Sequence, residues 1–518
     1  MSPVHCFSAV VATTAFLVGQ IPYGASTSGS GGFAPRLRAV GIPFLGNAGF
    51  GLELTEGLGG AIGVVMLSAE RADLNLAGTR VLVGLQPQQL LLSTLVVLGG
   101  TPAVAGDGSV LLPVPLTSPA TPALSGVQLF GQAAVLDPAA APSGFAASQG
   151  LLVEASLPPR IFVGVSGSGS DPYWLVDTAS QVVLQTASQA PSEVQRAAFV
   201  DGNRFVYAGL SGVNRIDVLD TDNPAAGWSP FWTATNTLSA LAYDRNSRRI
   251  YTGTYTGGPF GFGDWTLRAI GADPASPTYG SPLASTSGLG AFFPAFSIPS
   301  WRLSPSGRHA AILDAQSTPP RIFLVDTDPA SSGYMSFTSL GAVPTSPGPC
   351  CPLINDCAFT PRDEQLVVSI QYVGSASGEI ARFDLGAGSW IDHDPSTPSV
   401  DAIGPSSSPS VAPPSAIGNL DVSLDGTTIA AAGFVGGIGR LRIDPQDPAI
   451  WDYLPIAVST TASNTWSCAV SPDGSQIAFV DAPSNAAATL RFVDARTGAP
   501  AGSVSLGAII GFHMCIWR

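Results

Sequence analysis

Residues Trp466–Gly498 read WSCAVSPDGSQIAFVDAPSNAAATLRFVDARTG, and this stretch decides the fold. Ser471-Pro472-Asp473-Gly474 predicts a tight turn, because proline presets φ, aspartate bonds its own backbone and glycine adopts a positive φ. The apolar runs Ile477–Val480 and Leu490–Val493 predict buried strands. The second run ends at Asp494, directly before another polar turn.

The same pattern recurs from Pro159 to the C-terminus. With Gly271 filling the place in one repeat, the strand ends lie 43 to 60 residues apart. A period of about 40–50 residues with four strands in each repeat is typical of β-propeller blades. Residues 159–518 therefore predict a seven-bladed β-propeller. The aspartates that end the apolar strands are Asp177, Asp220, Asp326, Asp384, Asp444 and Asp494.

The first repeat lacks its first strand, since Arg160–Val163 already matches a second strand. The end of the chain supplies a candidate, because Gly511–Arg518 (GFHMCIWR) matches the first-strand pattern of Trp466–Val470. We predict that this last strand completes the first blade and closes the ring, so that no sheet edge stays open.

The N-terminal part differs from the repeats. Phe7–Val18 is an apolar run of signal-peptide length, and small residues follow it. A buried N-terminal strand is the alternative; we favour a signal peptide over residues 1–25, with cleavage near Ala25. Ser26–Gly32 (STSGSGG) predicts a flexible linker over residues 26–32.

Residues 33–155 predict a β-sandwich domain, because several short apolar or alternating segments are separated by turns rich in Gly, Pro and Asp. The expected strands are Phe50–Leu54, Val81–Leu85, Leu90–Leu98, Val110–Val114 and Val127–Leu136. The motifs Pro43-x-Leu45-Gly46-Asn47 and Leu129-Phe130-x-Gln132-x-x-Val135-Leu136-Asp137-Pro138 resemble an uncharacterised module of secreted planctomycete and myxobacterial proteins. The resemblance implies export and carries no activity.

The turn Ser471–Gly474 and the strand-final aspartates resemble the YVTN/lactonase-like β-propeller superfamily, and the TolB-type and WD40-like propellers beside it. The resemblance covers residues 159–518 and implies the fold. That superfamily includes lactone hydrolases, amine dehydrogenase subunits and surface proteins without a known reaction. The blades lack the recurring Trp-Asp and Gly-His pairs of true WD40 repeats, since Trp-Asp occurs once, at Trp451-Asp452, and they also lack the Trp-rich repeats of quinone enzymes.

Charge narrows the classes of partner. The formal net charge is −14, and all 22 basic residues are arginines. This negative balance disfavours nucleic acid and anionic membrane surfaces as partners, because both bind to positively charged protein surfaces. The absence of lysine excludes Schiff-base chemistry and the phosphate-loop lysine. No internal apolar run reaches the roughly 20 residues of a spanning helix, so we expect no transmembrane segment in the mature chain.

The strand-final aspartates have two readings, as ligands or as turn formers that bond backbone N–H groups, and their regular recurrence favours turn formers. Acidic clusters that break the repeat are candidate Ca²⁺ ligands, weighed against solvated turns. The densest is Asp392, His393 and Asp394. The other clusters are Asp217, Asp220 and Asp222, and Asp326 with Asp328.

The cysteines and histidines provide few candidates for a catalytic or metal site. Cys350 and Cys351 lie in a Pro-rich segment and are the candidate disulfide or redox-active pair. Cys357, Cys468 and Cys515 hold equivalent first-strand positions and predict buried apolar side chains. No sequence motif brings His309, His393 or His513 into a catalytic triad or a zinc site.

The sequence predicts an exported all-β protein, secreted, periplasmic or on the cell surface. We expect a non-enzymatic binding or scaffold protein of the cell envelope, without a cofactor, that binds a protein or glycan at a propeller face. The segments Gly257–Asp264, Ser285–Pro299 and Asp394–Ser415 are expected to be loops that carry this surface. The alternative is a lactonase-like hydrolase with a divalent metal in the funnel.

Overall fold

The structure is a computed structural model, and it describes most of the chain from residue 20 onward. The described residues are 20–41, 43–116, 126–166, 173–178, 180–187, 194–200, 204–210, 214–255, 263–292, 301–314, 320–344, 352–360, 363–372, 378–392, 417–422, 428–433, 438–443, 451–456, 463–464, 467–471, 474–483, 487–508 and 512–517. The all-β class is confirmed, because these residues form many small antiparallel sheets. Two short 3-10 helices, η1 (Ser30–Gly32) and η3 (Pro224–Ala226), lie between strands.

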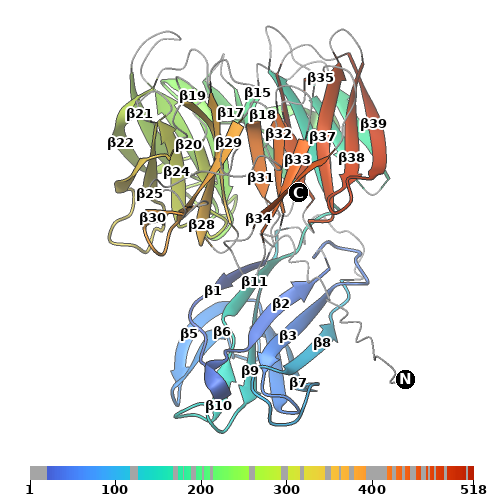
Figure 1. The fold of residues 1–518 in the computed structure, drawn as a ribbon, viewed down its shortest axis with the longest axis vertical. Coiled ribbons are helices and arrows are strands. Elements are labelled where there is room, and N and C mark those ends of the chain that lie inside the picture. The colour runs from blue at the N-terminus through green and yellow to red at the C-terminus, as the bar shows by residue number, and fades with distance from the viewer. Residues whose placement is uncertain are drawn as a thin grey trace, which may run out of the picture.

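The N-terminal domain contains two main sheets and a hairpin (Figure 1). The six-stranded sheet has the order β1-β11-β9-β4-β7, with β10 beside β9, and the three-stranded sheet has the order β2-β3-β8. Its strands are β1 (Gln20–Tyr23), β2 (Arg36–Val40), β3 (Gly51–Gly57), β4 (Ile62–Ser68), β5 (Arg71–Leu76), β6 (Thr79–Val83), β7 (Leu90–Val97), β8 (Gly108–Pro113), β9 (Gln128–Leu136), β10 (Phe145–Ala147) and β11 (Gly150–Glu154).

Alternating side chains give the two main sheets one shared core. Leu52 and Leu54 of β3 pack with Val65 and Leu67 of β4, and all four are at most 5% exposed. Alternate residues of a strand point to opposite faces, so one face of each sheet can turn inward. All five strands predicted in this region from apolar alternation are present, within a few residues of their predicted bounds.

Strand structure begins on the N-terminal side of the predicted boundary, whereas the cleavage of a signal peptide stays a prediction. β1 pairs with β11 from Gln20 to Tyr23, so the sheet begins before the predicted cleavage near Ala25. The predicted flexible linker is also structured: Thr27 bridges Ala147, and the Ser30 backbone N–H donates to Asp137 at 2.6 Å. A Ser/Gly-rich composition suggests flexibility, but here the neighbouring sheet satisfies the backbone polar groups. Residues 1–19, which hold the predicted signal run, lie outside the described residues.

The described residues after Pro159 form seven sheets of four or five strands, which we number ring sheets 1 to 7. Ring sheets 1 to 3 comprise β40 (Phe512–Trp517), β12 (Arg160–Ser166), β13 (Tyr173–Asp177) and β14 (Val182–Ala187); β15 (Val194–Val200), β16 (Phe205–Leu210), β17 (Arg215–Asp220) and β18 (Trp228–Thr233); and β19 (Thr237–Asp244), β20 (Arg249–Tyr255), β21 (Gly263–Gly271) and β22 (Pro282–Phe292).

Ring sheets 4 to 7 continue in chain order. They comprise β23 (Trp301–Leu303), β24 (His309–Asp314), β25 (Arg321–Asp326) and β26 (Phe337–Ala342); β27 (Pro352–Phe359), β28 (Gln365–Tyr372), β29 (Gly378–Asp384) and β30 (Ser389–Trp390); β31 (Ile417–Val422), β32 (Thr428–Gly433), β33 (Ile438–Ile443) and β34 (Trp451–Ile456); and β35 (Ser463–Asn464), β36 (Cys468–Val470), β37 (Gln476–Pro483), β38 (Ala487–Asp494) and β39 (Pro500–Ala508).

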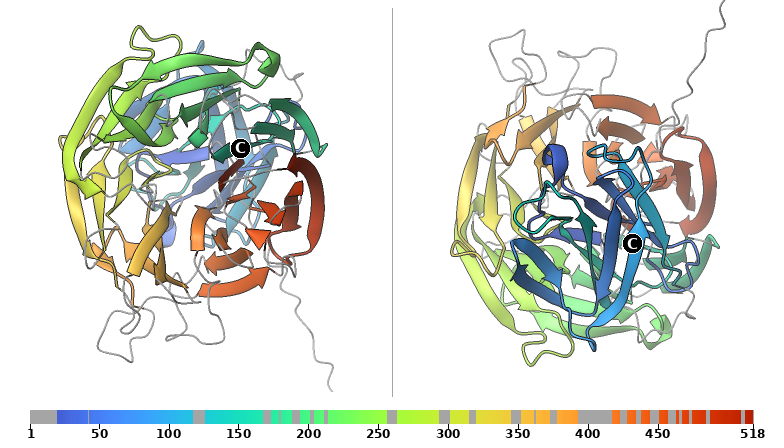
Figure 2. Two further views of the ribbon diagram at one scale, coloured as in Figure 1. Left: turned by 90° about the horizontal axis from the view of Figure 1, so that it is seen from above. Right: turned by 90° about the horizontal axis from the view of Figure 1, so that it is seen from below.

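These sheets surround a common axis, as the views along it show (Figure 2). One apolar cluster lies between each pair of neighbouring ring sheets, and the last cluster joins ring sheet 7 to ring sheet 1. The strand β12 is an example: Ile161 and Val163 face ring sheet 7, while Phe162, between them, faces ring sheet 2. Each ring sheet is therefore buried on both faces, which only a neighbour on each side can provide.

The predicted closing strand is present. β40 pairs antiparallel with β12 along its whole length, from Phe512 opposite Ser166 to Trp517 opposite Ile161. The two ends of the ring are therefore joined by backbone hydrogen bonds within one sheet, and ring sheet 1 takes strands from both ends of residues 159–518.

The loop prediction for Ser285–Pro299 is wrong for Ser285–Phe292, which belong to β22, because pairing with β21 outweighs the Gly- and Ser-rich composition. Gly257–Phe262 and Asp394–Ser415 lie outside the described residues. Among the described residues, no helix has the length and apolar character needed to cross a membrane.

Deleting residues 511–518 removes β40, and we expect loss of cooperative thermal unfolding of the ring. The deletion exposes an edge of β12 and removes the strand pairing that joins the two ends of the ring in the described part of the chain. The measurement is a thermal melt by circular dichroism, with a deletion inside residues 401–411 as the control. A deletion variant that melts like the full chain would contradict the role of β40.

Candidate functional site

The innermost strands of the ring are β40, β15, β19, β23, β27, β31 and β36, which contact one another in turn around the axis. Charged residues interrupt this mostly apolar set on three consecutive ring sheets. They are Arg302 in β23, Asp356 in β27 and Asp421 in β31. These positions form the candidate site, because their side chains lie close together and bond one another or the neighbouring backbone.

Arg302 reaches from ring sheet 4 across β27 to ring sheet 6. Its Nη2 donates to Asp356 Oδ2 at 2.6 Å and to the carbonyl oxygen of Leu420 at 3.0 Å, and its Nε donates to Asp356 Oδ1 at 3.2 Å. This is a two-point guanidinium–carboxylate pair, the geometry that gives arginine its specificity for carboxylates. One side chain therefore ties three ring sheets together near the axis.

Both oxygens of Asp356 accept further hydrogen bonds. Oδ1 accepts the backbone N–H of Cys357 at 2.9 Å, and Oδ2 accepts that of Leu420 at 3.0 Å. With the two bonds from Arg302, the carboxylate accepts four, about the full capacity of an ionised carboxylate. Asp356 is 1% exposed, so its acceptors are used within the protein and cannot bind a metal ion or take up a substrate proton without breaking these bonds.

Electrostatics favour the ionised pair. Burial lowers the pKa of Arg302, but the charge and hydrogen bonds of Asp356 together with the nearby charge of Asp421 outweigh it and raise the pKa above its ordinary value. Asp421 itself accepts the backbone N–H of Val470 in β36 at 2.8 Å. The site thus continues from ring sheet 4 to ring sheet 7 through side chains that bind the neighbouring backbone.

The strand-final aspartates lie at turns. Each of the five within the described residues accepts a hydrogen bond from a backbone N–H group two or three residues later. The donors are Ser180 for Asp177, Asp222 for Asp220, Asp328 for Asp326, Ala387 for Asp384, and both Arg496 and Thr497 for Asp494. Asp444 lies outside the described residues.

The acidic clusters proposed for Ca²⁺ are partly engaged by arginine. Asp217 pairs with Arg215, Asp222 with Arg160 at 3.4 Å, and Asp328 with Arg308 at 3.8 Å. Asp392 follows β30, whereas His393 and Asp394 lie outside the described residues. Within the residues that the structure describes, no three His, Cys, Asp or Glu side chains converge as a metal site.

Cys350 and Cys351 also lie outside the described residues, so their pairing stays a prediction. Cys357 and Cys468 are at most 2% exposed, as predicted for first-strand positions. His309 begins β24, and the side chain of His513 in β40 is not among those described.

Turns at one end of the ring axis form a second connected region. Asn246 Nδ2 donates to the Ser306 carbonyl oxygen at 2.6 Å, and the Ser306 hydroxyl donates to Asp363, which links ring sheets 3, 4 and 5. Gly307 has a φ of +73°, and a Cβ there would lie 2.2 Å from Asp244 Oδ1. Burial raises the pKa values of Asp244 and Asp363, although hydrogen bonds partly oppose it.

The N-terminal domain lies at this end (Figure 1). Gln128 Nε2 donates to the carbonyl oxygen of Arg245 at 3.1 Å, and Arg248 Nη2 donates to that of Gly126 at 3.3 Å. Both ring residues belong to the turn between β19 and β20. The domain also lies across the ring when viewed from below, so it covers this end of the axis (Figure 2).

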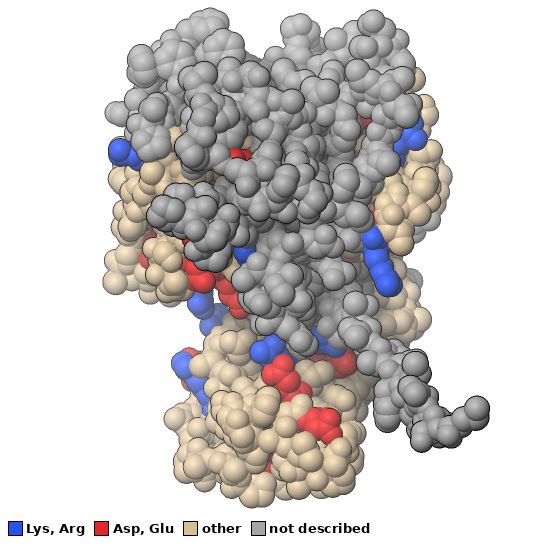
Figure 3. All heavy atoms as spheres, viewed as in Figure 1, with Lys and Arg blue, Asp and Glu red and all other residues tan. Residues whose placement is uncertain are grey.

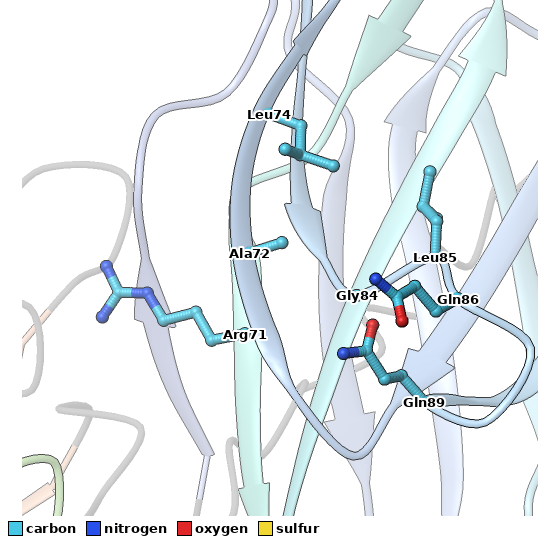
Figure 4. Close-up of a pocket in the computed structure, with 7 residues that line it drawn as sticks. All are labelled: Arg71, Ala72, Leu74, Gly84, Leu85, Gln86 and Gln89. Carbon is cyan, nitrogen blue, oxygen red and sulfur yellow. The ribbon is translucent and has the colours of Figure 1, made fainter.

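The N-terminal domain has a shallow pocket of about 350 Å³ beside β5. Gln86 and Gln89 extend toward each other across it, while Arg71 points away (Figure 4). The Arg71 guanidinium instead lies over the ring of Tyr23, 4.6 Å from its centroid, and Gln89 Nε2 donates to Glu70. The polar groups around this pocket therefore bind one another more than they face its interior.

No protein-family model and no curated protein matches this sequence. Solved structures resemble it at low identity. The β-propeller domain of Cps50 (Swd1) from Myceliophteria thermophila shares 12% identity with a TM-score of 0.44, over 62% of this chain and 89% of that one. A Bacteroides uniformis protein provisionally named as a 6-phosphogluconolactonase shares 14% identity with a TM-score of 0.45, over 70% of this chain and 100% of that one.

A protein of unknown function from Desulfotomaculum acetoxidans shares 12% identity with a TM-score of 0.48, over 68% of this chain and 98% of that one. All three TM-scores lie below 0.5, so the assignment of this fold rests on the strand pairings and the core clusters.

The sequence reasoning missed Arg302 and Asp356. A signal was present for Arg302, which stands at a first-strand position that carries alanine in several other repeats, whereas the position of Asp356 holds Arg196 and Asn419 in two others. Sequence could not show that the two side chains meet, because they lie 54 residues apart on different sheets.

Replacing Arg302 with Met should lower the unfolding free energy of the ring by about 3 kcal/mol, the cost of leaving a buried charge without its partner. The double variant Arg302→Met with Asp356→Leu should recover most of this loss. Urea unfolding measures both. Arg308→Met is the control, because that exposed pair with Asp328 should contribute at most about 0.5 kcal/mol. If the losses of unfolding free energy in Arg302→Met and in Asp356→Leu alone add up to the loss in the double variant, the two residues are not a coupled pair.

Asp494→Ala should lower the stability of the ring by about 1 kcal/mol at pH 7, as for other side chains that cap backbone N–H groups. The hydroxyl and backbone N–H of Thr497 lower the pKa of Asp494 below 3.8. A lowered pKa in the folded state means that the stabilisation is present above pH about 4 and is lost as pH falls through the folded pKa. Urea unfolding at pH 7 and pH 3 checks this; a difference independent of pH would contradict it.

Proposed function

We propose that residues 159–518 form a seven-bladed β-propeller and that the N-terminal sheets form a β-sandwich. Seven ring sheets with one core cluster between each neighbouring pair support the first assignment. The core shared by the six-stranded and three-stranded sheets supports the second. In this proposal the sandwich extends from Gln20 to about residue 155, and the signal peptide ends before β1.

We propose that the protein is a non-enzymatic binding or scaffold protein. One observation carries this proposal: the buried carboxylate near the ring axis, Asp356, has its acceptors filled by Arg302 and two backbone N–H groups. A catalytic carboxylate needs an oxygen that can reach a metal ion or a substrate proton. The Asp356 carboxylate instead joins neighbouring ring sheets, and such links would make the ring a rigid surface for binding.

The ligand in this proposal is a protein or a glycan, held at the end of the ring axis opposite the N-terminal domain. The domain's hydrogen bonds to Arg245 and Arg248 occupy the other end. Secretion, or location in the periplasm or at the cell surface, is part of the same proposal and rests on the apolar run Phe7–Val18. The lactonase-like alternative needs a bound divalent metal.

A thermal-shift series on the purified full chain separates the two functions. We expect the same melting temperature in EDTA as with Ca²⁺, Mg²⁺, Mn²⁺ or Zn²⁺. An ion that binds only the folded chain would add about 2.7 kcal/mol at a hundredfold excess over its Kd. A rise with one ion, together with hydrolysis of simple lactones, would overturn the binding proposal and support the hydrolase.

A glycan array probed with the same full chain tests the positive side of the proposal. We expect a retained ligand class whose binding survives EDTA and persists in Arg308→Met, which alters only an exposed ion pair at the covered end. If Ca²⁺ raises the melting temperature without lactone hydrolysis, the cluster Asp392, His393 and Asp394 is the first to replace, by Asp392→Asn.

A further inference from the structure

One face of the N-terminal domain is apolar and exposed. β4 and β7 pair so that Ile62 lies opposite Val97, and Val64 opposite Leu95. Their outward side chains, together with Leu91, form what we call the β4–β7 face. Ile62, Leu91, Leu95 and Val97 are 52%, 58%, 78% and 69% exposed. Apolar residues this exposed and this close together mark contact surfaces in soluble proteins.

The described residues cover only part of this side of the six-stranded sheet. On β9 and β11 the same side packs against the β5–β6 hairpin, where Leu82 contacts Tyr23, Phe130 and Leu152. The Gln132 side chain also accepts the Leu82 backbone N–H at 2.8 Å. The hairpin reaches one end of β4, whereas Ile62 of β4 and Leu91, Leu95 and Val97 of β7 keep exposed side chains.

β7 is also the last strand of its sheet, and no strand in the described part of the chain pairs with its outer edge. It has eight residues, Leu90–Val97, without a charge or a proline. Proteins protect edge strands of this length with charges, prolines or bulges, because an unprotected edge pairs with other strands. β7 carries no charge and no proline, and the register shift in its pairing with β4 lies near its start, between Leu90 and Leu92.

We propose that the β4–β7 face and the edge of β7 bind a second copy of this chain, by antiparallel pairing of β7 with its counterpart. Charge favours this occupant. The chain carries a net charge of −14, whereas β4 and β7 contain no ionisable residue, so two copies can meet here without repulsion at the contact. On the view of Figure 3, the end of the domain far from the ring is mostly uncharged.

Two-fold symmetry is also compatible with a second copy of the chain at this face. A two-fold axis at Ser93 places Leu91 opposite Leu95 of the second copy and Leu95 opposite its Leu91, while Val97 lies opposite Gln89, just before the second copy's β7. Such an interface uses one surface twice and closes at two copies. The four strongly exposed apolar residues are few compared with the roughly 20–30 residues that each partner contributes to a standard interface. We therefore expect a dimer that dissociates on dilution. This inference holds whatever ligand the ring binds.

Sedimentation velocity of the full chain over about a hundredfold range of concentration around the micromolar region tests the proposal, because small interfaces dissociate there. We expect the wild-type mass to rise from one copy to two. Leu95→Glu should stay at one copy throughout, because it places a carboxylate opposite Leu91 of each copy. Leu283→Glu, at an exposed leucine of β22 in the ring, is the control and should behave like the wild type.

Ser93→Cys tests the register. Residues opposite each other in an antiparallel pair have Cα atoms about 4.5–5.5 Å apart, within the disulfide range of about 4.4–6.8 Å. Under mild oxidation this variant should form a covalent dimer that the wild type, with its native cysteines, does not form. A wild-type chain that stays at one copy at every concentration, or a Leu95→Glu variant that dimerises normally, would overturn the proposal. Circular dichroism confirms that each variant is folded.

Discussion

The structure depends on closure of the ring, because each ring sheet has two apolar faces and can bury both only with a neighbour on each side. Phe162 and Val163 are adjacent in β12, yet they serve cores on opposite sides of ring sheet 1. The strand alternation that produces this arrangement is a local property. Its energetic benefit is not local, because the cluster between ring sheets 7 and 1 forms only when the chain returns to its start. The backbone hydrogen bonds between β40 and β12 hold the end of the chain at that position.

The polar interior follows from the same closure. Innermost strands lie close together around the axis, so a long side chain on one of them can pass its neighbour. Arg302 does this and satisfies both Asp356 and the Leu420 backbone. An ion pair in this position adds specificity for one arrangement of ring sheets 4 to 6, since a shift of any of them would leave a buried charge alone. Stability and alignment of the platform are thus linked at one residue pair.

The two domains meet at turns rather than at strands. The turn between β19 and β20 accepts one hydrogen bond from Gln128 and donates another through Arg248, and its neighbour in ring sheet 4 is held by Asn246. The domain covers one end of the axis and leaves the β4–β7 face exposed.

The sequence by itself determined the strands, the turns, the period and the identity of the closing strand, because alternation, turn chemistry and strand-final aspartates are all local. It failed at Gln20–Gly32, where small polar residues that suggest a linker are held by the distant Ala147 and Asp137. Only the tertiary structure decided which charges meet, since Arg302 and Asp356 become neighbours through ring geometry and not through spacing. It alone decided which apolar strand stays exposed: Leu90–Val97 resembles a core strand in sequence, and its exposure follows from its place at the edge of a sheet.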